Sequence, residues 1–380
     1  MSAVPATSLS SGKSDSSDRL GVMVVDDSAV IRGIFRRTLE ADPDIEVVAS
    51  VSNGQQAIDA LAKQPVDVVV LDIEMPVMDG MTALPKLLEI APDVKIIMAS
   101  TLTEKNAAIS LEALQMGAAD YIPKPTAKYE IHSADSFKRE LVEKIKALGG
   151  HSRRTLNRPA PRAASVPLAA NKKAEPAAPV AKRSVSNVPP RIISIGSSTG
   201  GPQALFKVFE GLKGNIDHLP VVIAQHMPKA FTGILAEHLS KVADARCGEG
   251  IDGEPLEAGR IYVAPGDFHM YIEKSGTGHV IRLNQEPAEN YCRPSVEPLF
   301  RSVAKEFGSA TLALMLTGMG HDGLDASETL VDTGATLIAQ DEESSVVWGM
   351  PGAVANAGLC AEILPIDQIA PRAINLMRRA

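Results

Sequence analysis

Short apolar runs alternate with amphipathic segments along most of this chain, and the alternation occurs in two separate series. In the segment 29–39, for example, Ile34 and Phe35 fall on one helical face, while Arg32 and Arg36 fall on the other. Parallel strands need long crossover connections, usually helices, so this alternation predicts parallel sheets covered by helices. We therefore expect an α/β fold with two doubly wound parallel domains.

The first series predicts a (βα)5 domain and the second a further α/β domain. In the first, strands are expected at 21–25, 45–49, 66–71, 95–99 and 120–122, and helices at 29–39, 55–62, 80–90, 104–116 and 136–148. In the second, strands are expected at 191–195, 221–224, 260–263, 311–316 and 335–339, and helices at 203–211, 231–241, 296–307, 323–332 and 352–357. A hairpin is expected at 270–283, with Ser275 and Gly276 at its turn.

The regions outside the two series differ from them in composition. Residues 1–19 are polar and rich in serine, which predicts a flexible leader. Residues 146–190 are rich in alanine, proline and basic side chains, which predicts a linker. The expected domains are thus 20–145 and 191–380. A role of the linker's charge in binding an acidic partner is the weaker hypothesis.

Charge and cysteine content exclude several classes of protein. The formal net charge of -8 argues against general binding of nucleic acid. The 3 cysteines are far apart and form no C-x-x-C pair, so we expect neither a disulfide framework nor a zinc site. The polar beginning has no signal-peptide pattern, and no uncharged run predicts a membrane span. We expect a cytoplasmic protein that does not insert into membranes.

Three aspartates follow strands of the first series. Asp26 and Asp27 come after the first expected strand, and Asp72 after the third. The carboxyl ends of parallel strands form the ligand-binding edge of such a sheet, so these side chains are expected to meet. Carboxylates in close contact repel one another unless a cation joins them, and Mg²⁺ prefers oxygen ligands of this kind. The cluster predicts a Mg²⁺ site that can also hold a phosphoryl group.

Two further positions at the same edge suit a phosphoryl group. Ser100 or Thr101 ends the fourth strand and offers a hydroxyl, while Lys124 follows the fifth strand and offers a positive charge. Taken singly, an aspartate here caps a helix and a lysine here is a surface residue. The full set in this order is much more specific.

These residues resemble the receiver domain of bacterial response regulators over about residues 20–145. The pieces that carry the resemblance are Asp26-Asp27, Asp72-Ile-Glu-Met-Pro76, Asp79-Gly80, Ser100 and Lys124-Pro125. The resemblance implies that Asp72 accepts the phosphoryl group and that Asp26, Asp27 and Asp72 bind Mg²⁺ together with the backbone carbonyl of Glu74. It also implies that Ser100 changes position on phosphorylation and that Lys124 contacts the phosphoryl group.

The second series opens with a strand that ends in a glycine-rich turn. The pattern Gly196-x-Ser198-x-Gly200 resembles a nucleophile elbow, which exposes a serine between a strand and a helix, and Pro202 suits the first turn of that helix. The helix N-terminus would direct backbone N–H groups toward a developing oxyanion. From this stretch alone, a phosphate-binding turn or a simple connection stays open. Ser197 is the rival nucleophile, although a position facing the sheet suits it better.

A serine nucleophile needs a base, and the base needs a carboxylate that orients it. His226 follows the strand 221–224, and Asp322 lies in a glycine-rich turn after the strand 311–316. Together with Ser198 these residues are expected at one edge of one sheet. Their order along the chain, Ser then His then Asp, differs from that of α/β-hydrolases.

The second series resembles the catalytic domain of the chemotaxis protein-glutamate methylesterases, the CheB family. The pieces that carry the resemblance are Gly196-Ser-Ser-Thr-Gly-Gly201, Gln225-His-Met-Pro228, Ala264-Pro-Gly266, Arg293-Pro-Ser-Val296 and Leu316-Thr-Gly-Met-Gly-x-Asp-Gly323. The resemblance implies that Ser198 is the nucleophile, His226 the base and Asp322 the orienting acid. It makes the backbone N–H groups of Thr199 and Met319 candidates for the oxyanion hole.

The resemblance also implies a substrate and partners. The expected reactions are hydrolysis of glutamate γ-methyl esters on methyl-accepting chemotaxis receptors and deamidation of specific receptor glutamines, with a chemotaxis histidine kinase as phosphodonor. Mg²⁺ is expected to serve the receiver, and no cofactor the hydrolysis. Ser197 replaces a usual alanine and Cys292 a common histidine, which puts substrate contacts in doubt. The competing hypothesis is a phosphorylation-dependent adaptor with an inactive second domain; a DNA-binding regulator is less favoured.

Overall fold

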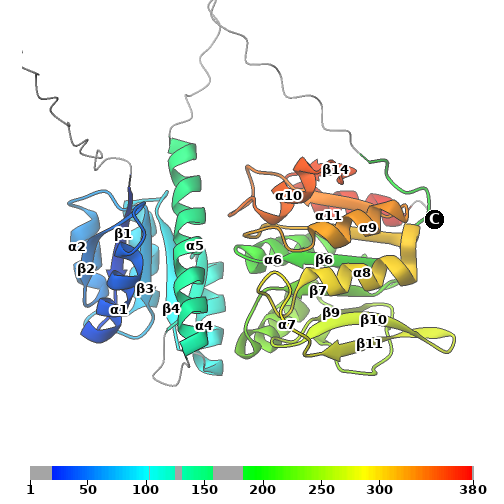
Figure 1. The fold of residues 1–380 in the computed structure, drawn as a ribbon, viewed down its shortest axis with the longest axis horizontal. Helices are drawn as coiled ribbons and strands as arrows, with labels where there is room; N and C mark the ends of the chain where they lie inside the picture. The colour runs from blue at the N-terminus through cyan, green and yellow to red at the C-terminus, as the bar shows by residue number, and fades with distance from the viewer. Residues whose placement is uncertain (1–18, 102, 125–130, 157–182, 379–380) are drawn as a thin grey trace, which may run out of the picture.

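The computed structural model describes residues 19–101, 103–124, 131–156 and 183–378, and within them two parallel α/β domains (Figure 1). The expected fold class is confirmed. The predicted division at 1–19, 20–145, 146–190 and 191–380 stays a prediction, and most of the predicted leader and linker lies outside the described residues.

The N-terminal domain is a 5-stranded parallel sheet in the order β2-β1-β3-β4-β5. Its strands are β1 (Leu20–Val25), β2 (Ile45–Val51), β3 (Val68–Asp72), β4 (Lys95–Ser100) and β5 (Asp120–Pro123). Its helices are α1 (Ala29–Glu40), α2 (Gly54–Leu61), α3 (Gly80–Ile90), α4 (Glu104–Gln115) and α5 (Ile131–Leu156). Strands β1 and β3 are neighbours, and this brings the ends that carry the three aspartates together.

The C-terminal domain contains a 7-stranded parallel sheet in the order β14-β13-β12-β6-β7-β9-β8. Its strands are β6 (Ile192–Ser197), β7 (Val221–Gln225), β8 (Arg246–Glu249), β9 (Arg260–Val263), β12 (Thr311–Met315), β13 (Thr336–Gln340) and β14 (Glu362–Leu364). Its helices are α6 (Gly201–Leu212), α7 (Lys229–Ala243), α8 (Val296–Phe307), the 3-10 turn η1 (Gly308–Ala310), α9 (Leu324–Asp332), α10 (Met350–Asn356) and α11 (Ile366–Met377). The strands that precede the three expected catalytic residues, β12, β6 and β7, lie side by side at the centre of this sheet.

Several elements differ from their sequence-based prediction. Helix α5 extends from Ile131 to Leu156, beyond the predicted range 136–148 at both ends, and its apolar residues Ile145 and Leu148 pack in the core of the domain. The hairpin of β10 (His269–Ser275) and β11 (Gly278–Asn284) turns one residue later than predicted, since the left-handed φ of 58° at Gly276 belongs to a turn with Thr277. The edge strands β8 and β14 are too short to show a pattern.

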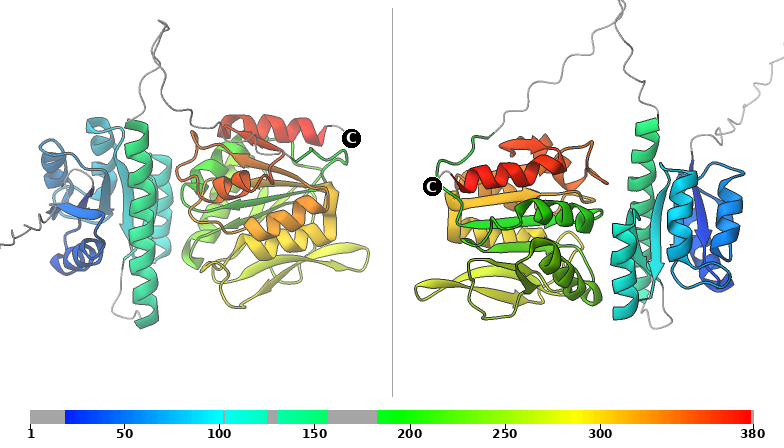
Figure 2. Two further views of the ribbon diagram at one scale, coloured as in Figure 1. Left: turned by 45° about the horizontal axis from the view of Figure 1, so that its top comes forward. Right: turned by 180° about the vertical axis from the view of Figure 1, so that it is seen from behind.

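The two domains are in contact through α4 and β5 on one side and α6 and α7 on the other. Helix α5 adds a contact between Arg139 and the ring of Tyr291. Figure 1 and Figure 2 show α5 and α4 on the side of the N-terminal domain that faces the C-terminal domain. The ring of Tyr121 stacks on that of Phe231, with centroids 4.3 Å apart. Gln203 donates to the backbone carbonyl of Ala118 at 2.7 Å. Apolar residues of both domains thereby form one continuous cluster.

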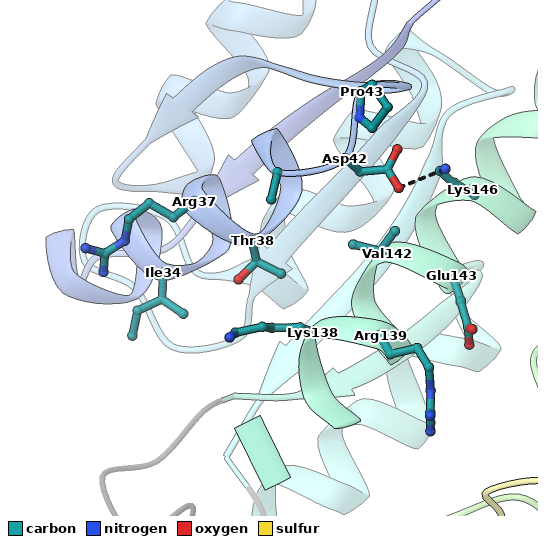
Figure 3. Close-up of a pocket in the computed structure, with 11 residues that line it drawn as sticks. Ile34, Arg37, Thr38, Asp42, Pro43, Lys138, Arg139, Val142, Glu143 and Lys146 are labelled. Atoms are coloured by element: carbon teal, nitrogen blue, oxygen red, sulfur yellow. Dashed lines mark ion pairs between the residues drawn. The ribbon is translucent and has the colours of Figure 1, made fainter. Parts of the chain in front are cut away.

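A groove of about 790 Å³ lies between α1 and α5 of the N-terminal domain (Figure 3). Lys146 on α5 pairs with Asp42 at its end, with 2.8 Å between Nζ and Oδ2. None of the residues that line the groove belongs to the aspartate cluster of this domain or to the edge that carries Ser198, although Arg139 also contacts the C-terminal domain. Within the described ranges, no helix is both long and apolar enough to cross a membrane.

Candidate active site

The turn after β6 presents Ser198 at the centre of the sheet edge. Gly200 has a φ of 74°, a left-handed conformation that suits glycine, and the next residue begins α6. A Cβ at Gly318 would lie 2.9 Å from Cβ of Ser198, so this neighbour also has to be glycine. Ser198 is partly exposed, and its hydroxyl makes no hydrogen bond to a described residue.

Gln225, the last residue of β7, fixes the turns that carry Ser198 and His226. Its Nε2 donates to the carbonyl oxygens of Ser198 at 2.9 Å and of His226 at 3.1 Å. Its Oε1 accepts the hydroxyl of Ser197 at 2.6 Å, and Ser197 is fully buried. The rival serine therefore faces the interior, while Ser198 faces the open edge.

His226 has a partner on each ring nitrogen. Its Nε2 lies 2.7 Å from Oδ2 of Asp322, and its Nδ1 lies 3.3 Å from Sγ of Cys292. Burial alone lowers the pKa of His226, but the charges of Cys292 and Asp322 and the hydrogen bonds they form outweigh burial and raise it above the usual value. The structure thus joins the expected base to the expected acid, with Ser198 on the neighbouring strand end.

Asp322 is almost completely buried, and four donors surround its carboxylate. Oδ1 accepts from the hydroxyl of Ser295 at 2.7 Å and from the amide of Asn290 at 2.9 Å. Oδ2 accepts from His226 and from the backbone N–H of Val296 at 2.6 Å, in the first turn of α8. Burial raises the pKa of Asp322, but these hydrogen bonds and the charge of His226 outweigh it and lower the pKa to about 2. The carboxylate of Asp322 is therefore held in its ionised form.

A second buried carboxylate supports the turn that carries Asp322. Glu297, in the first turn of α8, accepts from the backbone N–H groups of Gly323 at 2.9 Å, Asp325 at 3.2 Å and Ala326 at 2.7 Å. These N–H groups are at the beginning of α9, where no helical acceptors exist. Asp322, just before α9, therefore caps the beginning of α8, and Glu297 of α8 caps the beginning of α9.

Two backbone N–H groups near Ser198 suit an oxyanion hole. The N–H groups of Thr199 and Met319 donate to no acceptor among the described residues. Both belong to turns that end neighbouring strands, after β6 and after β12. Unpaired donors at such a position can stabilise a tetrahedral oxyanion.

The three aspartates of the N-terminal domain lie together, with ligand oxygens within 4.8 Å of one another. Asp26 and Asp72 are buried and Asp27 is exposed. Lys124 reaches both buried carboxylates, with Nζ 2.8 Å from Oδ2 of Asp26 and 2.6 Å from Oδ1 of Asp72. Burial, partly offset by Lys124, raises the pKa of Asp72 to about 6. Oδ2 of Asp72 is buried without a hydrogen bond to a described residue, so the cluster fits a divalent cation.

The remaining expected receiver residues surround this cluster. Ser100 is buried at the end of β4, and its hydroxyl accepts from Ser110 of α4 at 3.2 Å. Glu74 follows Asp72 closely, and its side chain points to Lys105, 3.6 Å away. Thr101 accepts from the amide of Asn106. Ser100, rather than Thr101, therefore has its hydroxyl inside the domain between the aspartates and α4.

The contact between the domains lies next to the Ser198 edge. Phe231, which stacks on Tyr121, is in the first turn of the helix that follows His226. Tyr291 lies under the guanidinium of Arg139 from α5, 3.7 Å from Cζ to the ring centroid. Met319 packs against an apolar cluster that contains α5 residues. The N-terminal domain thus contacts the helix that follows His226, the turn before α8 and Met319, a candidate for the oxyanion hole.

Sequence reasoning missed four residues that hold Ser198, His226 and Asp322 or their turns in place, namely Gln225, Asn290, Ser295 and Glu297. For Ser295 there was a signal, because serine before an apolar helical segment is a typical N-cap. For Asn290 there was none, since its contact with Asp322 spans 32 residues.

Comparison with known proteins matches both domains. Residues 193–373 match the family described as CheB methylesterase, and residues 22–134 match the response regulator receiver domain. A protein-glutamate methylesterase/protein-glutamine glutaminase of Paramagnetospirillum magneticum is 53% identical over 96% of this chain and 98% of its own length. One from Azospirillum brasilense is 56% identical over 93% of this chain and 92% of its own. The crystal structure of the Thermotoga maritima CheB methylesterase catalytic domain is 37% identical, covers 50% of this chain and 100% of its own, and has a TM-score of 0.48.

Proposed function

The chain belongs to the CheB methylesterase family, and we infer that it hydrolyses glutamate methyl esters and deamidates glutamines in proteins, as the names of its relatives state. The observation that carries this proposal is the edge formed by β12, β6 and β7, where the turn of Ser198 adjoins the hydrogen-bonded pair of His226 and Asp322. Methyl-accepting chemotaxis receptors are the proposed substrates, and the cytoplasmic setting stays a prediction.

The proposed mechanism is acyl transfer through Ser198. Its hydroxyl adds to the ester carbonyl while His226 takes the proton, and the N–H groups of Thr199 and Met319 bind the oxyanion. The C–O bond to the methoxy group then breaks, and His226 returns the proton so that methanol leaves. Water attacks the acyl-enzyme with His226 again as base, which regenerates Ser198 and leaves a glutamate. A glutamine amide reacts in the same way and releases ammonia.

In this mechanism Asp322 orients His226 and stabilises the imidazolium that forms. Because Asp322 is bonded to Nε2, the nitrogen that receives the serine proton is Nδ1. The steps use only side chains and backbone groups of the C-terminal domain.

We propose that Asp72 is the phosphorylation site and that Asp26, Asp27, Asp72 and the backbone carbonyl of Glu74 hold Mg²⁺. A bound Mg²⁺ supplies positive charge to the phosphoryl oxygens. A chemotaxis histidine kinase is the proposed phosphodonor. Lys124, which already contacts two of these carboxylates, would pair with the phosphoryl group.

Phosphorylation is proposed to control access to Ser198 through the domain contact. A phosphoryl group on Asp72 would draw the hydroxyl of Ser100 away from Ser110. Ser100 lies on β4, the neighbour of the strand that carries Tyr121, and Tyr121 stacks on Phe231. A change on this strand would weaken the contact and open the edge to a helical substrate.

The test is methanol release from methylated receptor membranes, with and without a small-molecule phosphodonor. Ser198→Ala should lower release by about 10⁴-fold or more, as in other serine triads. Ser197→Ala is the matched control and should cost less than about tenfold, because its hydroxyl is turned toward Gln225. Asp72→Ala should abolish only the increase with phosphodonor. Normal phosphorylation of Asp72 without any methanol release would favour the adaptor.

A further inference from the structure

Cys292 contacts Nδ1 of His226, the ring nitrogen that accepts the proton of Ser198 in the proposed mechanism. Its Sγ is 3.3 Å from Nδ1 of His226, while Nε2 of the same ring is bonded to Asp322. Because both nitrogens are engaged, neither is free to accept the proton of Ser198. The hydroxyl of Ser198 has no hydrogen bond to any residue in the described ranges.

The turn that carries Cys292 is anchored at each of its residues. The N–H of Cys292 donates to the carbonyl of Glu289 at 2.8 Å, and both central residues, Asn290 and Tyr291, have left-handed φ values of 49° and 64°. Such a pair of φ values is typical of a type I′ turn, which residues other than glycine and asparagine rarely adopt. The cysteine is therefore presented by a backbone conformation that needs support.

Side chains of this turn supply the support. The carboxylate of Glu289 forms two hydrogen bonds with the guanidinium of Arg301 on α8, at 2.8 and 2.6 Å. The amide of Asn290 donates to Asp322 at 2.9 Å. One turn thus contacts both the acid, through Asn290, and the base, through Cys292.

We propose that Cys292 is a positioning residue that holds His226 in a resting arrangement and has to release Nδ1 before Ser198 can be deprotonated. This inference rests on the proposed roles of Ser198 and His226. The hydroxyl of Ser198 then takes the place of Sγ, while Asp322 keeps the ring in the same plane. Cys292 takes no part in bond making or breaking.

The charges around His226 give the proposal a pH dependence with a defined sign. Among the described residues, the titratable groups that face the ring are Cys292 and Asp322, and Glu297 and Arg301 lie behind Asp322. After burial, which lowers it, the interaction with Cys292 is the largest influence on the pKa of His226, and it raises that pKa. Loss of Cys292 should therefore let His226 act as a base at lower pH, while the groups around Asp322 are unchanged.

The first test is the pH profile of kcat/KM for Cys292→Ala, with Cys247→Ala as matched control. The acid limb of the profile should move to lower pH by about one unit or more, which is about a tenfold gain on that limb. Cys247 lies on β8, and burial raises the pKa of its thiol to about 12, so its variant should keep the wild-type limb. An unshifted limb in Cys292→Ala, with normal folding, would overturn the proposal.

The second test does not depend on hydrolysis. Iodoacetamide forms an S–C bond with a thiolate and releases iodide, and the thiol proton passes to the base and then to solvent. Peptide mass spectrometry of the full chain at neutral pH should show Cys292 alkylated at least about tenfold faster than Cys247 or the buried Cys360. His226→Asn should remove most of this difference; an unchanged rate at Cys292 would refute the pairing even if the enzyme releases methanol.

Discussion

Replacement of Asp322 by asparagine tests how strongly the buried carboxylate orients His226. The carboxylate accepts four hydrogen bonds and is 2% exposed. An asparagine of the same shape offers one acceptor oxygen, and its NH₂ group faces donors. The fall in the pKa of Asp322, from the ordinary aspartate value of 3.8 to about 2 in the folded protein, corresponds at 1.36 kcal/mol per unit to about 2 kcal/mol of stability at neutral pH.

The sign of the pH dependence follows from the lowered pKa. A group whose pKa falls on folding contributes fully above its unfolded pKa, near 4, and loses the contribution as the pH falls toward about 2. Urea denaturation should show Asp322→Asn less stable than wild type by about 2 kcal/mol at pH 7. This gap should shrink by about 1 kcal/mol between pH 5 and pH 3. Over that range the wild type loses the stability that the ionised Asp322 contributes, whereas the variant has no carboxylate at this position to protonate.

The kinetic effect should be larger than the effect on stability. With its tautomer no longer fixed, His226 is a poor base, and kcat/KM for methanol release should fall by about 10³- to 10⁴-fold. Asp325→Asn is the matched control, since Asp325 is exposed in the same turn and should keep activity within about twofold. If folded Asp322→Asn keeps more than about a tenth of wild-type activity, the reasoning fails, and a gap in stability that does not change with pH would refute the electrostatic part.

Two predictions concern the N-terminal domain. Tyr121→Ala removes the ring that stacks on Phe231, a contact of about 0.5–1.5 kcal/mol, so methanol release without phosphodonor should rise by about two- to tenfold. Tyr271→Ala on β10 is the control. If Tyr121→Ala gives no rise, this contact does not control access to Ser198. Lys124→Met removes the ammonium group between Asp26 and Asp72, so the response to phosphodonor should be lost while basal release is unchanged; a normal response would show that Lys124 is not needed for the switch.

The sequence allowed the fold to be predicted because both series follow the physical rules of parallel sheets. Ser198 and His226 could be placed at one edge because each directly follows an apolar strand, and β6 and β7 are neighbours. Asp322 could be placed with them through β12 on the other side of β6. Position at a strand end is a local property, so a single sequence reveals it.

Contacts that depend on distant turns could not be predicted. Cys292 reaches His226 across 66 residues through a turn whose two central residues have left-handed φ. Asn290 suits a left-handed φ, but Tyr291 does not, and the turn depends on contacts with Arg301 and Asp322 elsewhere in the chain. For the same reason, the sequence suggested that Cys292 concerned substrate contacts rather than the base.

Helices α8 and α9 each begin at a carboxylate supplied from beside the other, and this mutual capping affects how the enzyme loses activity on heating. Asp322 binds the first turn of α8, and Glu297 binds the first turn of α9, so undocking either helix leaves donors of both without acceptors. Local opening of one helix is therefore coupled to that of the other, and Asp322, the proposed catalytic acid, belongs to a single cooperative unit. Heat should then inactivate the enzyme in one step with the melting of this helix pair, without a folded but inactive intermediate.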